Sequence, residues 1–131
     1  MPRGTACRIL VVEDEILIAM DMEHMLEDAG YGVMGAFSNV ADSLRALDKE
    51  DKPAAAILDV QLDGEDVFPV ADRLGELGVP IVFHSGHAEP SKLAEQYPDA
   101  RFCVKPCTPN ILTAEVEAAI AGVSAEREAA E

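Results

Sequence analysis

Acidic side chains follow two of the most apolar runs in the chain. Glu13 and Asp14 come directly after residues 8–12, and Asp59 ends the run at residues 54–59. Such runs predict strands that are buried on both faces, and the carboxyl ends of parallel strands meet at one edge of a sheet. Three carboxylates brought together there repel one another unless a cation compensates them. The pattern therefore predicts a site for a hard divalent cation, Mg²⁺ or Mn²⁺.

A hydroxyl and an amine are predicted at the same edge. Ser85 follows the apolar run at residues 80–84, and Lys105 follows residues 101–104. A carboxylate can attack phosphorus and form an aspartyl phosphate. The transferred phosphoryl group then needs positive charge and hydrogen-bond donors on its oxygens, which a divalent cation, Lys105 and Ser85 would supply. These residue types favour phosphoryl transfer to an acidic side chain.

Short apolar runs alternate with amphipathic stretches along the whole chain. This alternation predicts an α/β domain with a parallel sheet and helices on both faces. The expected strands are 8–12, 31–37, 54–59, 80–84 and 101–104, and the expected helices are 15–29, 39–49, 66–77, 88–96 and 109–121. Residues 61–65 are expected to form a loop. Gly122 is expected to end the last helix and to leave a short polar tail at 123–131.

Length and charge limit the classes of function. The chain has 131 residues, which suits one domain over residues 1–131 with a core at about 7–121. Ten Lys and Arg stand against 25 Asp and Glu, a net charge of −15. This balance leaves no basic face for nucleic acid or for an anionic membrane surface, and it suits a protein that holds a cation or meets a basic partner. No apolar run is long enough to span a membrane.

Cysteine usage predicts a reducing compartment. The chain contains Cys7, Cys103 and Cys107, and this odd, low count argues against a disulfide framework and favours the cytoplasm. Cys103 is expected to be a small core residue. A zinc site built from Cys103, Cys107, His84 and His87 is disfavoured, because their spacing matches no closed Cys/His site.

Four short motifs together resemble the signatures of response-regulator receiver domains. They are VVEDE at residues 11–15, ILDV at 57–60, FHSG at 83–86 and VKP at 104–106. Their order is that of the family, and the resemblance covers residues 7–121. It implies a flavodoxin-like, doubly wound (βα)₅ fold with a five-stranded parallel sheet in the order 2-1-3-4-5.

The resemblance also implies roles for the acidic residues. Asp59 corresponds to the phospho-acceptor. Asp14 corresponds to the direct Mg²⁺ ligand, and Glu13 to the carboxylate that acts mainly through water. The backbone carbonyl of Gln61 would complete the metal ligands that the protein supplies.

Further family positions concern signalling. Lys105 matches the amine that pairs with the phosphate, Ser85 the switch hydroxyl, and Phe102 the switch aromatic. Leu17 lies on the polar side of the predicted helix 15–29, where receivers dock their kinases, and is therefore a candidate partner contact. The segment between Ser85 and Lys105 is slightly shorter than in most receivers and contains two prolines, which predicts a stunted fourth helix. Phosphorylation is expected to order or shift residues 86–99.

The expected function is that of a single-domain response regulator. A histidine kinase or a histidine phosphotransfer protein would donate the phosphoryl group to Asp59, and an unidentified downstream protein would read the result. No nucleic acid or membrane partner is expected, and a homodimer is compatible with the sequence. Beyond self-catalysed phosphotransfer and dephosphorylation, no enzyme activity is expected. A phosphate sink and a binding module that is never phosphorylated remain as alternatives.

Two enzyme or cofactor classes that share this architecture are disfavoured. A haloacid-dehalogenase-type phosphatase has a second Asp two residues after its nucleophile, where this chain has Gln61. A flavin carrier needs a phosphate loop rich in Ser, Thr and Gly after its first strand. Here the acidic residues 13–15 would repel a phosphate.

Overall fold

The strands form one parallel sheet with the predicted order. The computed structural model describes residues 7–49, 52–62, 65–86, 90–105 and 107–130. The order β2-β1-β3-β6-β7 is 2-1-3-4-5 when only the strands of this sheet are counted along the chain, and its pairs are parallel. The strands are β1 (Arg8–Val12), β2 (Gly32–Phe37), β3 (Ala55–Asp59), β6 (Ile81–Ser85) and β7 (Arg101–Val104).

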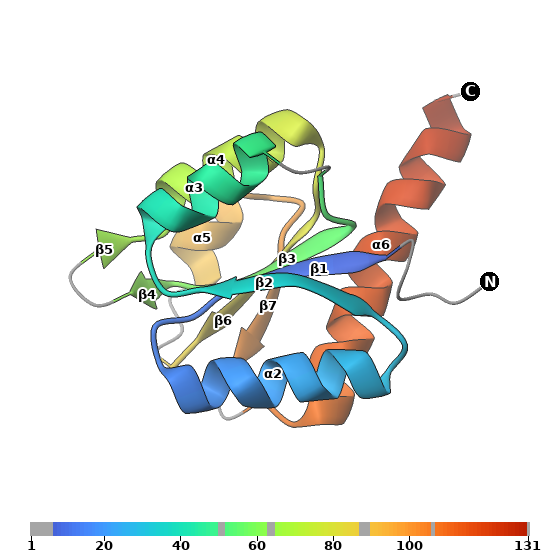
Figure 1. Cartoon of the computed structure of the whole chain (residues 1–131). Helices are drawn as coiled ribbons and strands as arrows, with labels where there is room; N and C mark the ends of the chain where they lie inside the picture. Colours follow the sequence, from blue (N-terminus) through green and yellow to red (C-terminus); the bar gives the residue numbers. More distant parts are fainter. Residues whose placement is uncertain (1–6, 50–51, 63–64, 87–89, 106, 131) are drawn as a thin grey trace.

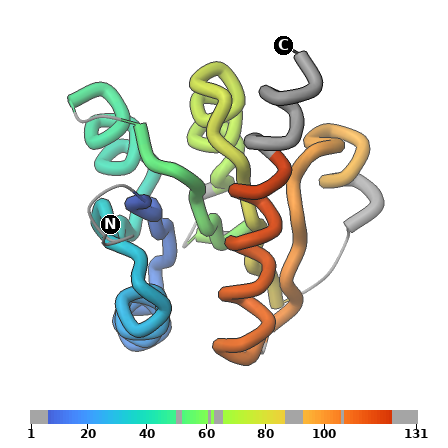
Figure 2. Tube along the Cα trace, turned by 90° about the vertical axis from the view of Figure 1, so that its right-hand side faces the viewer, coloured from blue at the N-terminus to red at the C-terminus, as the bar shows by residue number. Residues whose placement is uncertain are grey.

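Helices cover both faces of this sheet. On one face lie α2 (Ile16–Asp28) and α6 (Pro109–Ala130), and α6 runs along the strands, as Figure 2 shows. The other face carries α3 (Val40–Lys49), α4 (Phe68–Leu77) and α5 (Pro90–Gln96) (Figure 1). The fold is therefore the flavodoxin-like, doubly wound architecture that the sequence predicted.

Successive strand residues enter two separate apolar cores. Leu10 and Leu58 belong to the core under α3, α4 and α5, whereas Ile9 and Ile57 belong to the core under α2 and α6. All four side chains are fully buried. Because both faces of the strands are covered, the strand sequences are continuously apolar rather than alternating.

A bulge in the β1–β2 pair determines how β2 meets the first acidic residue. The register shifts between Ile9 and Leu10, so that Leu10 lies opposite Gly35 and Val12 opposite Phe37. Gly35 has φ +154°, and a Cβ there would lie 2.8 Å from the Phe37 ring. Both facts favour glycine at this position. The carbonyl of Phe37 accepts a hydrogen bond of 2.9 Å from the backbone N–H of Glu13.

The structure differs from the prediction in the segment after β3. Residues 61–65 were expected to be a loop, but β4 (Gln61–Leu62) and β5 (Glu65–Asp66) form an antiparallel pair. The next helix, expected from residue 66, therefore begins only at Phe68. Two-residue strands carry no hydrophobic periodicity, so no sequence pattern indicates them.

The last helix is longer than expected. Gly122 does not end α6, which continues to Ala130. A glycine within a helix costs about 1 kcal/mol relative to alanine, and the following residues include Ala, Glu and Arg, which favour helix. The prediction of a frayed polar tail from residue 123 was therefore wrong over 123–130. Of the segment 86–99, residues 87–89 lie outside the described residues, and α5 has seven residues, as short as predicted.

Candidate functional site

The carboxyl ends of four strands bring the predicted polar residues to one edge of the sheet. Glu13 follows β1, Asp59 ends β3, Ser85 ends β6 and Lys105 follows β7. The backbone N–H of Lys105 donates a hydrogen bond of 2.7 Å to the Ser85 carbonyl, which fixes the end of β7 against β6. Four residues that are far apart in sequence thus converge because their strands are parallel neighbours.

Three carboxylates meet at this edge. One oxygen from each of Glu13, Asp14 and Asp59 lies within 4.8 Å of the others. Glu13 and Asp59 are only 2% and 5% exposed, and Asp14 is half-buried. Among the residues that the structure describes, this is the only group of three or more His, Cys, Asp or Glu side chains with metal-ligand geometry.

Lys105 supplies positive charge to two of these acids. Its Nζ lies 3.2 Å from Glu13 Oε1 and donates a hydrogen bond of 3.4 Å to Asp59 Oδ2. Burial by itself would lower the pKa of Lys105, but the negative charges of Asp59 and Glu13 outweigh burial and raise it. The amine therefore stays protonated beside the acids.

The pKa of Glu13 shows that the single positive charge of Lys105 does not fully compensate the negative charge of the acidic cluster. Burial, followed by the neighbouring Asp59, raises the pKa of Glu13 to about 8, although the Glu15 backbone N–H and Lys105 act in the opposite direction. The Lys105 amine is within ion-pair distance, yet Glu13 Oε1 accepts no well-aligned hydrogen bond from any described residue. A buried carboxylate oxygen whose nearest cationic group is poorly aligned for a hydrogen bond fits a cation ligand.

The remaining predicted positions lie around this cluster. Ser85 is partly exposed, and Gln61 begins β4, two residues after Asp59. Phe102 is partly buried in β7, and its ring stacks on Phe83 with the two centroids 5.7 Å apart. The structure thus places all of these positions near the same edge, while their signalling roles stay predictions.

The start of α2 exposes more apolar surface than the sequence indicated. Leu17 is 73% exposed, in agreement with its predicted position on the polar side of the helix. Ile16 and Met20 are exposed as well. Met20 stands three residues after Leu17, so a search for apolar residues at helical spacing outside the core stripe could have found it. Together Ile16, Leu17 and Met20 form an apolar patch beside the acidic cluster.

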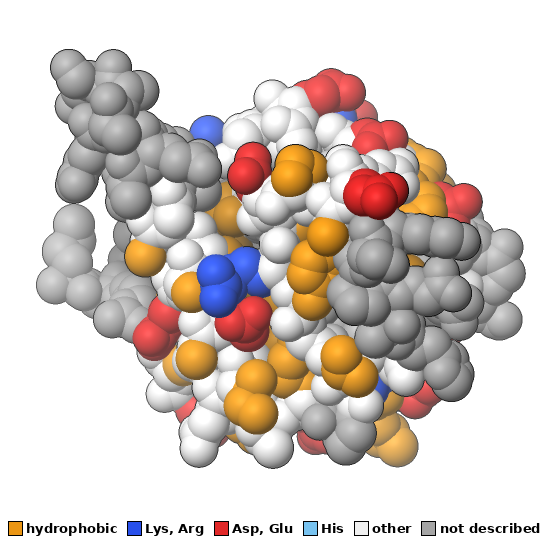
Figure 3. Space-filling model, turned by 180° about the vertical axis from the view of Figure 1, so that it is seen from behind, with side chains coloured by type: hydrophobic (Ala, Val, Ile, Leu, Met, Phe, Trp, Pro, Cys, Tyr) orange, Lys and Arg blue, Asp and Glu red, His pale blue; other side chains and the backbone are white. Residues whose placement is uncertain are grey.

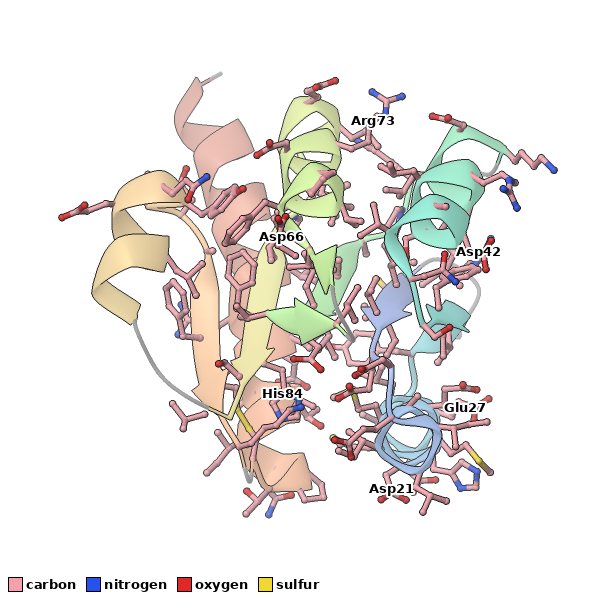
Figure 4. The ribbon with its side chains drawn as sticks, turned by 90° about the vertical axis from the view of Figure 1, so that its left-hand side faces the viewer. Asp21, Glu27, Asp42, Asp66, Arg73 and His84 are labelled. Atoms are coloured by element: carbon pink, nitrogen blue, oxygen red, sulfur yellow. A yellow bond between two sulfur atoms is a disulfide. The ribbon has the colours of Figure 1, made fainter. Side chains whose placement is uncertain are left out.

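Two features beside Lys105 were not predicted. Cys103 is buried, as expected of a core residue, but it is bonded to Cys107 in a disulfide. The expectation from the cysteine count against disulfides was therefore wrong for this pair, because two cysteines four residues apart can meet across a turn. His84 is 5% exposed, and neither of its ring nitrogens has a hydrogen-bond partner among the described residues. Burial, followed by the Lys105 charge, lowers the pKa of His84. Figure 4 shows His84 between the end of β6 and α2. His87, which the disfavoured zinc site would include, lies outside the described residues.

Apolar side chains also gather on the side of the molecule formed by the outermost strand β7 and its neighbouring helices. Figure 3 shows this back face, which is formed by β7, α5 and α6. Its exposed large hydrophobic residues include Val104 on β7 and Ile111 on α6. Arg101 and Glu115 form an ion pair of 3.0 Å that joins β7 to α6. No helix in the described part of the chain is long and apolar enough to cross a bilayer.

Comparison with known proteins gives one consistent family. Residues 9–117 match the family model for the response regulator receiver domain. The chain is 31% identical over 117 residues to the phyllosphere-induced regulator PhyR of Methylorubrum extorquens. The aligned region covers 88% of this chain and 44% of that protein. It is 30% identical over 117 residues to the transcriptional regulatory protein PdtaR of Mycobacterium tuberculosis, and this aligned region covers 86% of this chain and 56% of that protein.

Solved structures agree with these sequence matches. The response regulator PhyR from Brucella abortus superposes with a TM-score of 0.83 at 30% identity, over 99% of this chain and 54% of that chain. A response regulator receiver protein from Sinorhizobium medicae superposes with a TM-score of 0.79 at 28% identity, over 89% of this chain and 96% of that chain. The chain spans about half the length of the curated relatives it matches.

Proposed function

The chain belongs to the response-regulator receiver family, a family of two-component signalling, and on this premise we propose that Asp59 accepts a phosphoryl group from a phosphohistidine partner. One observation carries the proposal. The buried Asp59 carboxylate lies within reach of both the Lys105 amine and the two other acids. A carboxylate, a counter-charge and further acidic oxygens thereby lie at one point, which supports the proposal.

The acidic residues fit a divalent cation. Glu13, Asp14 and Asp59 would hold it, with the Gln61 backbone carbonyl as a further oxygen ligand. The support is the set of hard oxygen atoms together with the buried Glu13 oxygen, which accepts no well-aligned hydrogen bond from a described residue. When bound, Mg²⁺ or Mn²⁺ would neutralise the carboxylates and stabilise charge on the phosphoryl oxygens.

The protein's own residues have distinct tasks in the transfer. A carboxylate oxygen of Asp59 attacks phosphorus, the new O–P bond forms, and the P–N bond of the phosphohistidine breaks. The imidazole leaves with the bonding electron pair and takes a proton from solvent. Lys105 then pairs with a phosphoryl oxygen instead of sharing its charge between Glu13 and Asp59. Ser85, at the end of β6, would donate a hydrogen bond to another oxygen.

The signalling part of the proposal concerns partners. The donor is a histidine kinase or a histidine phosphotransfer protein, and we place its contact on the apolar patch of Ile16, Leu17 and Met20 beside the acidic cluster. Ser85 and Phe102 would transmit the change to a downstream protein. With a net charge of −15, that interaction is with protein rather than nucleic acid. We further propose that residues 7–121 act as one receiver unit in the cytoplasm.

Two alternatives share the same site. A phosphate sink would accept the phosphoryl group without changing its outer surface, and a pure binding module would never accept it. The assembled Asp59–Lys105 pair favours acceptance over the second alternative. A phosphatase that acts on free substrates is disfavoured, because Gln61 stands where such enzymes have a second aspartate.

The test is chemical phosphorylation followed by intact-mass measurement. The full chain is incubated with acetyl phosphate and Mg²⁺. We expect the wild type and Asp99→Asn, a change of an exposed carboxylate, to gain one phosphoryl mass. Asp59→Asn should gain none while keeping its fold, because the amide is nearly isosteric but is not a carboxylate nucleophile. Equal phosphorylation of Asp59→Asn, or none of the wild type, would contradict the proposal.

A further inference from the structure

The disulfide between Cys103 and Cys107 encloses the lysine of the acidic site. Cys103 lies in β7, and Cys107 directly precedes Thr108, whose Oγ1 accepts a hydrogen bond of 3.4 Å from Ile111 at the start of α6. The two Cα atoms are 6.1 Å apart, within the range of about 4.4–6.8 Å found in protein disulfides. Lys105 is the central residue of the ring that the bond closes.

We propose that Cys103 and Cys107 are a reversible dithiol–disulfide pair, oxidised by small-molecule disulfides, whose oxidation holds Lys105 at Asp59. The first half, the redox pair, depends only on the two cysteines. The second half, an effect on phosphorylation, rests on the proposed function of Asp59. The two halves are therefore tested separately below.

Access to the pair is asymmetric. Cys107 is partly exposed and lines a cleft of about 670 Å³ between α2 and α6, together with Met22, His84 and Leu112. Cys103 is 4% exposed and belongs to the apolar core under the same helices. A small disulfide that enters the cleft meets Cys107 first. Lys105 and Pro109, the first residue of α6, line the same cleft as Cys107.

The proposed reaction is a two-step thiol–disulfide exchange. The Cys107 thiolate attacks one sulfur of a disulfide such as oxidised glutathione, a new S–S bond forms, and one glutathione thiolate leaves. Cys103 then loses its proton to solvent and attacks the Cys107 sulfur, which displaces the second glutathione thiolate. Two protein thiols are oxidised by two electrons, and one small disulfide is reduced to two thiols. An excess of reduced glutathione reverses both steps.

The ring restrains the backbone that carries Lys105. On one side Lys105 is held by the hydrogen bond of its N–H to the Ser85 carbonyl. On the other side the disulfide ties Cys107, two residues after Lys105, to Cys103 in β7. In the dithiol form this second restraint is lost, and the amine must be ordered again when the phosphoryl group arrives. Reduction should therefore slow phosphorylation about fivefold, the factor that corresponds to fixing the backbone of about one residue.

The redox half is tested by counting the free thiols of the full chain. The protein is unfolded during alkylation, so that buried thiols react as well. The protein is equilibrated in glutathione buffers that range from oxidising to reducing. Thiol exchange is then stopped with an alkylating reagent, and the number of alkyl groups per chain is determined by intact-mass measurement. Since the chain has three cysteines, we expect one alkyl group in oxidising buffer, on Cys7, and three in reducing buffer. Cys7→Ser is the matched control and should carry no alkyl group in oxidising buffer and two alkyl groups in reducing buffer. Three groups throughout, or only a stable glutathione adduct on Cys107, would overturn the pair.

The coupling half is tested by phosphorylation rates with acetyl phosphate and Mg²⁺. We expect the oxidised wild type to react about fivefold faster than the reduced wild type. Cys107→Ser should react at one slow rate in both buffers, and Cys103→Ser, which also lacks the bond, should match it. The comparison of oxidised with reduced wild type needs no variant, so it remains valid even where a variant folds poorly. Equal wild-type rates in both buffers overturn the coupling, whereas no reaction in either buffer overturns the function of Asp59 and leaves the thiol counts to decide the pair.

Discussion

Leu58 and Asp59 are neighbours in β3 and are almost equally buried, yet their surroundings differ completely. Leu58 is fully buried among aliphatic side chains under α3, α4 and α5. Asp59, one residue further on, is 5% exposed beside two other carboxylates and one amine. Burial of Leu58 stabilises the fold, whereas burial of Asp59 opposes it. The interior of the sheet thus provides the stability that offsets the unfavourable burial of charge at its carboxyl edge.

The largest expected effect comes from the interior. Leu58→Ala should destabilise the protein by about 3 kcal/mol, since it removes buried methyl groups and leaves a cavity. Urea unfolding followed by circular dichroism measures the change. Leu17→Ala is the matched control and should stay within about 0.5 kcal/mol, because Leu17 is 73% exposed. Equal losses for the two variants would remove the distinction between interior and surface.

The next effect is a pH dependence that originates at the edge. In metal-free protein the pKa of folded Glu13 is about 8, above its ordinary value of 4.5, so the folded state binds this proton more tightly than the unfolded state. The stabilisation is complete below about pH 4.5 and is lost as the pH rises through about 8. Relative to Glu13→Gln, the wild type should lose unfolding free energy across this window, by about 2 kcal/mol after the shift is discounted by roughly half for solvent screening of the cluster.

The contribution of Glu13 is separated from other groups by taking differences. The lowered pKa of His84 acts in the opposite direction, with stability lost as the pH falls, but it is common to both proteins and cancels. Glu27→Gln, which changes an exposed carboxylate, should follow the wild-type pH curve. Parallel curves for Glu13→Gln and the wild type would show that Glu13 is not the titrating group.

A divalent cation should offset the unfavourable edge. Mg²⁺ at about ten times its dissociation constant should stabilise the wild type by about 1.4 kcal/mol, because the folded state alone assembles the three acids. Calorimetric melting with and without Mg²⁺ measures the shift. Asp14→Asn should lose most of it, and Asp99→Asn should keep it. An unchanged melting temperature of the wild type at millimolar Mg²⁺ would contradict the metal site.

The smallest effect is a gain of stability. In metal-free protein Asp59→Asn should be more stable than the wild type by about 1 kcal/mol, because one of the repelling charges is gone and Lys105 remains paired with Glu13. The same urea experiment measures it. A loss of stability would mean that the contact between Lys105 and Asp59 outweighs the repulsion among the acids.

The sequence predicted most of what depends on apolar periodicity and on the ends of strands. The continuous apolar run before Glu13 indicated a strand buried on both faces, and the structure buries it. Since parallel strands end at one edge, Asp59 and Lys105 could be placed together although they are 46 residues apart. Physical rules of this kind need no knowledge of side-chain conformation.

The features that the sequence did not predict depend on details of local geometry. The approach of Cys103 and Cys107 requires the turn between β7 and α6, whose shape no residue pattern specifies. Gly122 is a typical helix end, yet the helix-forming residues that follow outweigh it. His84 stands in an apolar strand, and only the structure shows that both its nitrogens lack partners among the described residues.

The bulge at Gly35 has a genetic consequence. A methyl group at this position would push the Phe37 ring aside, and the Phe37 carbonyl holds the backbone N–H of Glu13. A screen for loss of signalling should therefore recover Gly35→Ala, on a strand that contributes no side chain to the reaction. Second-site revertants should appear at Phe37, where a smaller side chain makes room for the methyl group. A substitution at position 35 would thus have the same effect as a substitution in the acidic cluster itself.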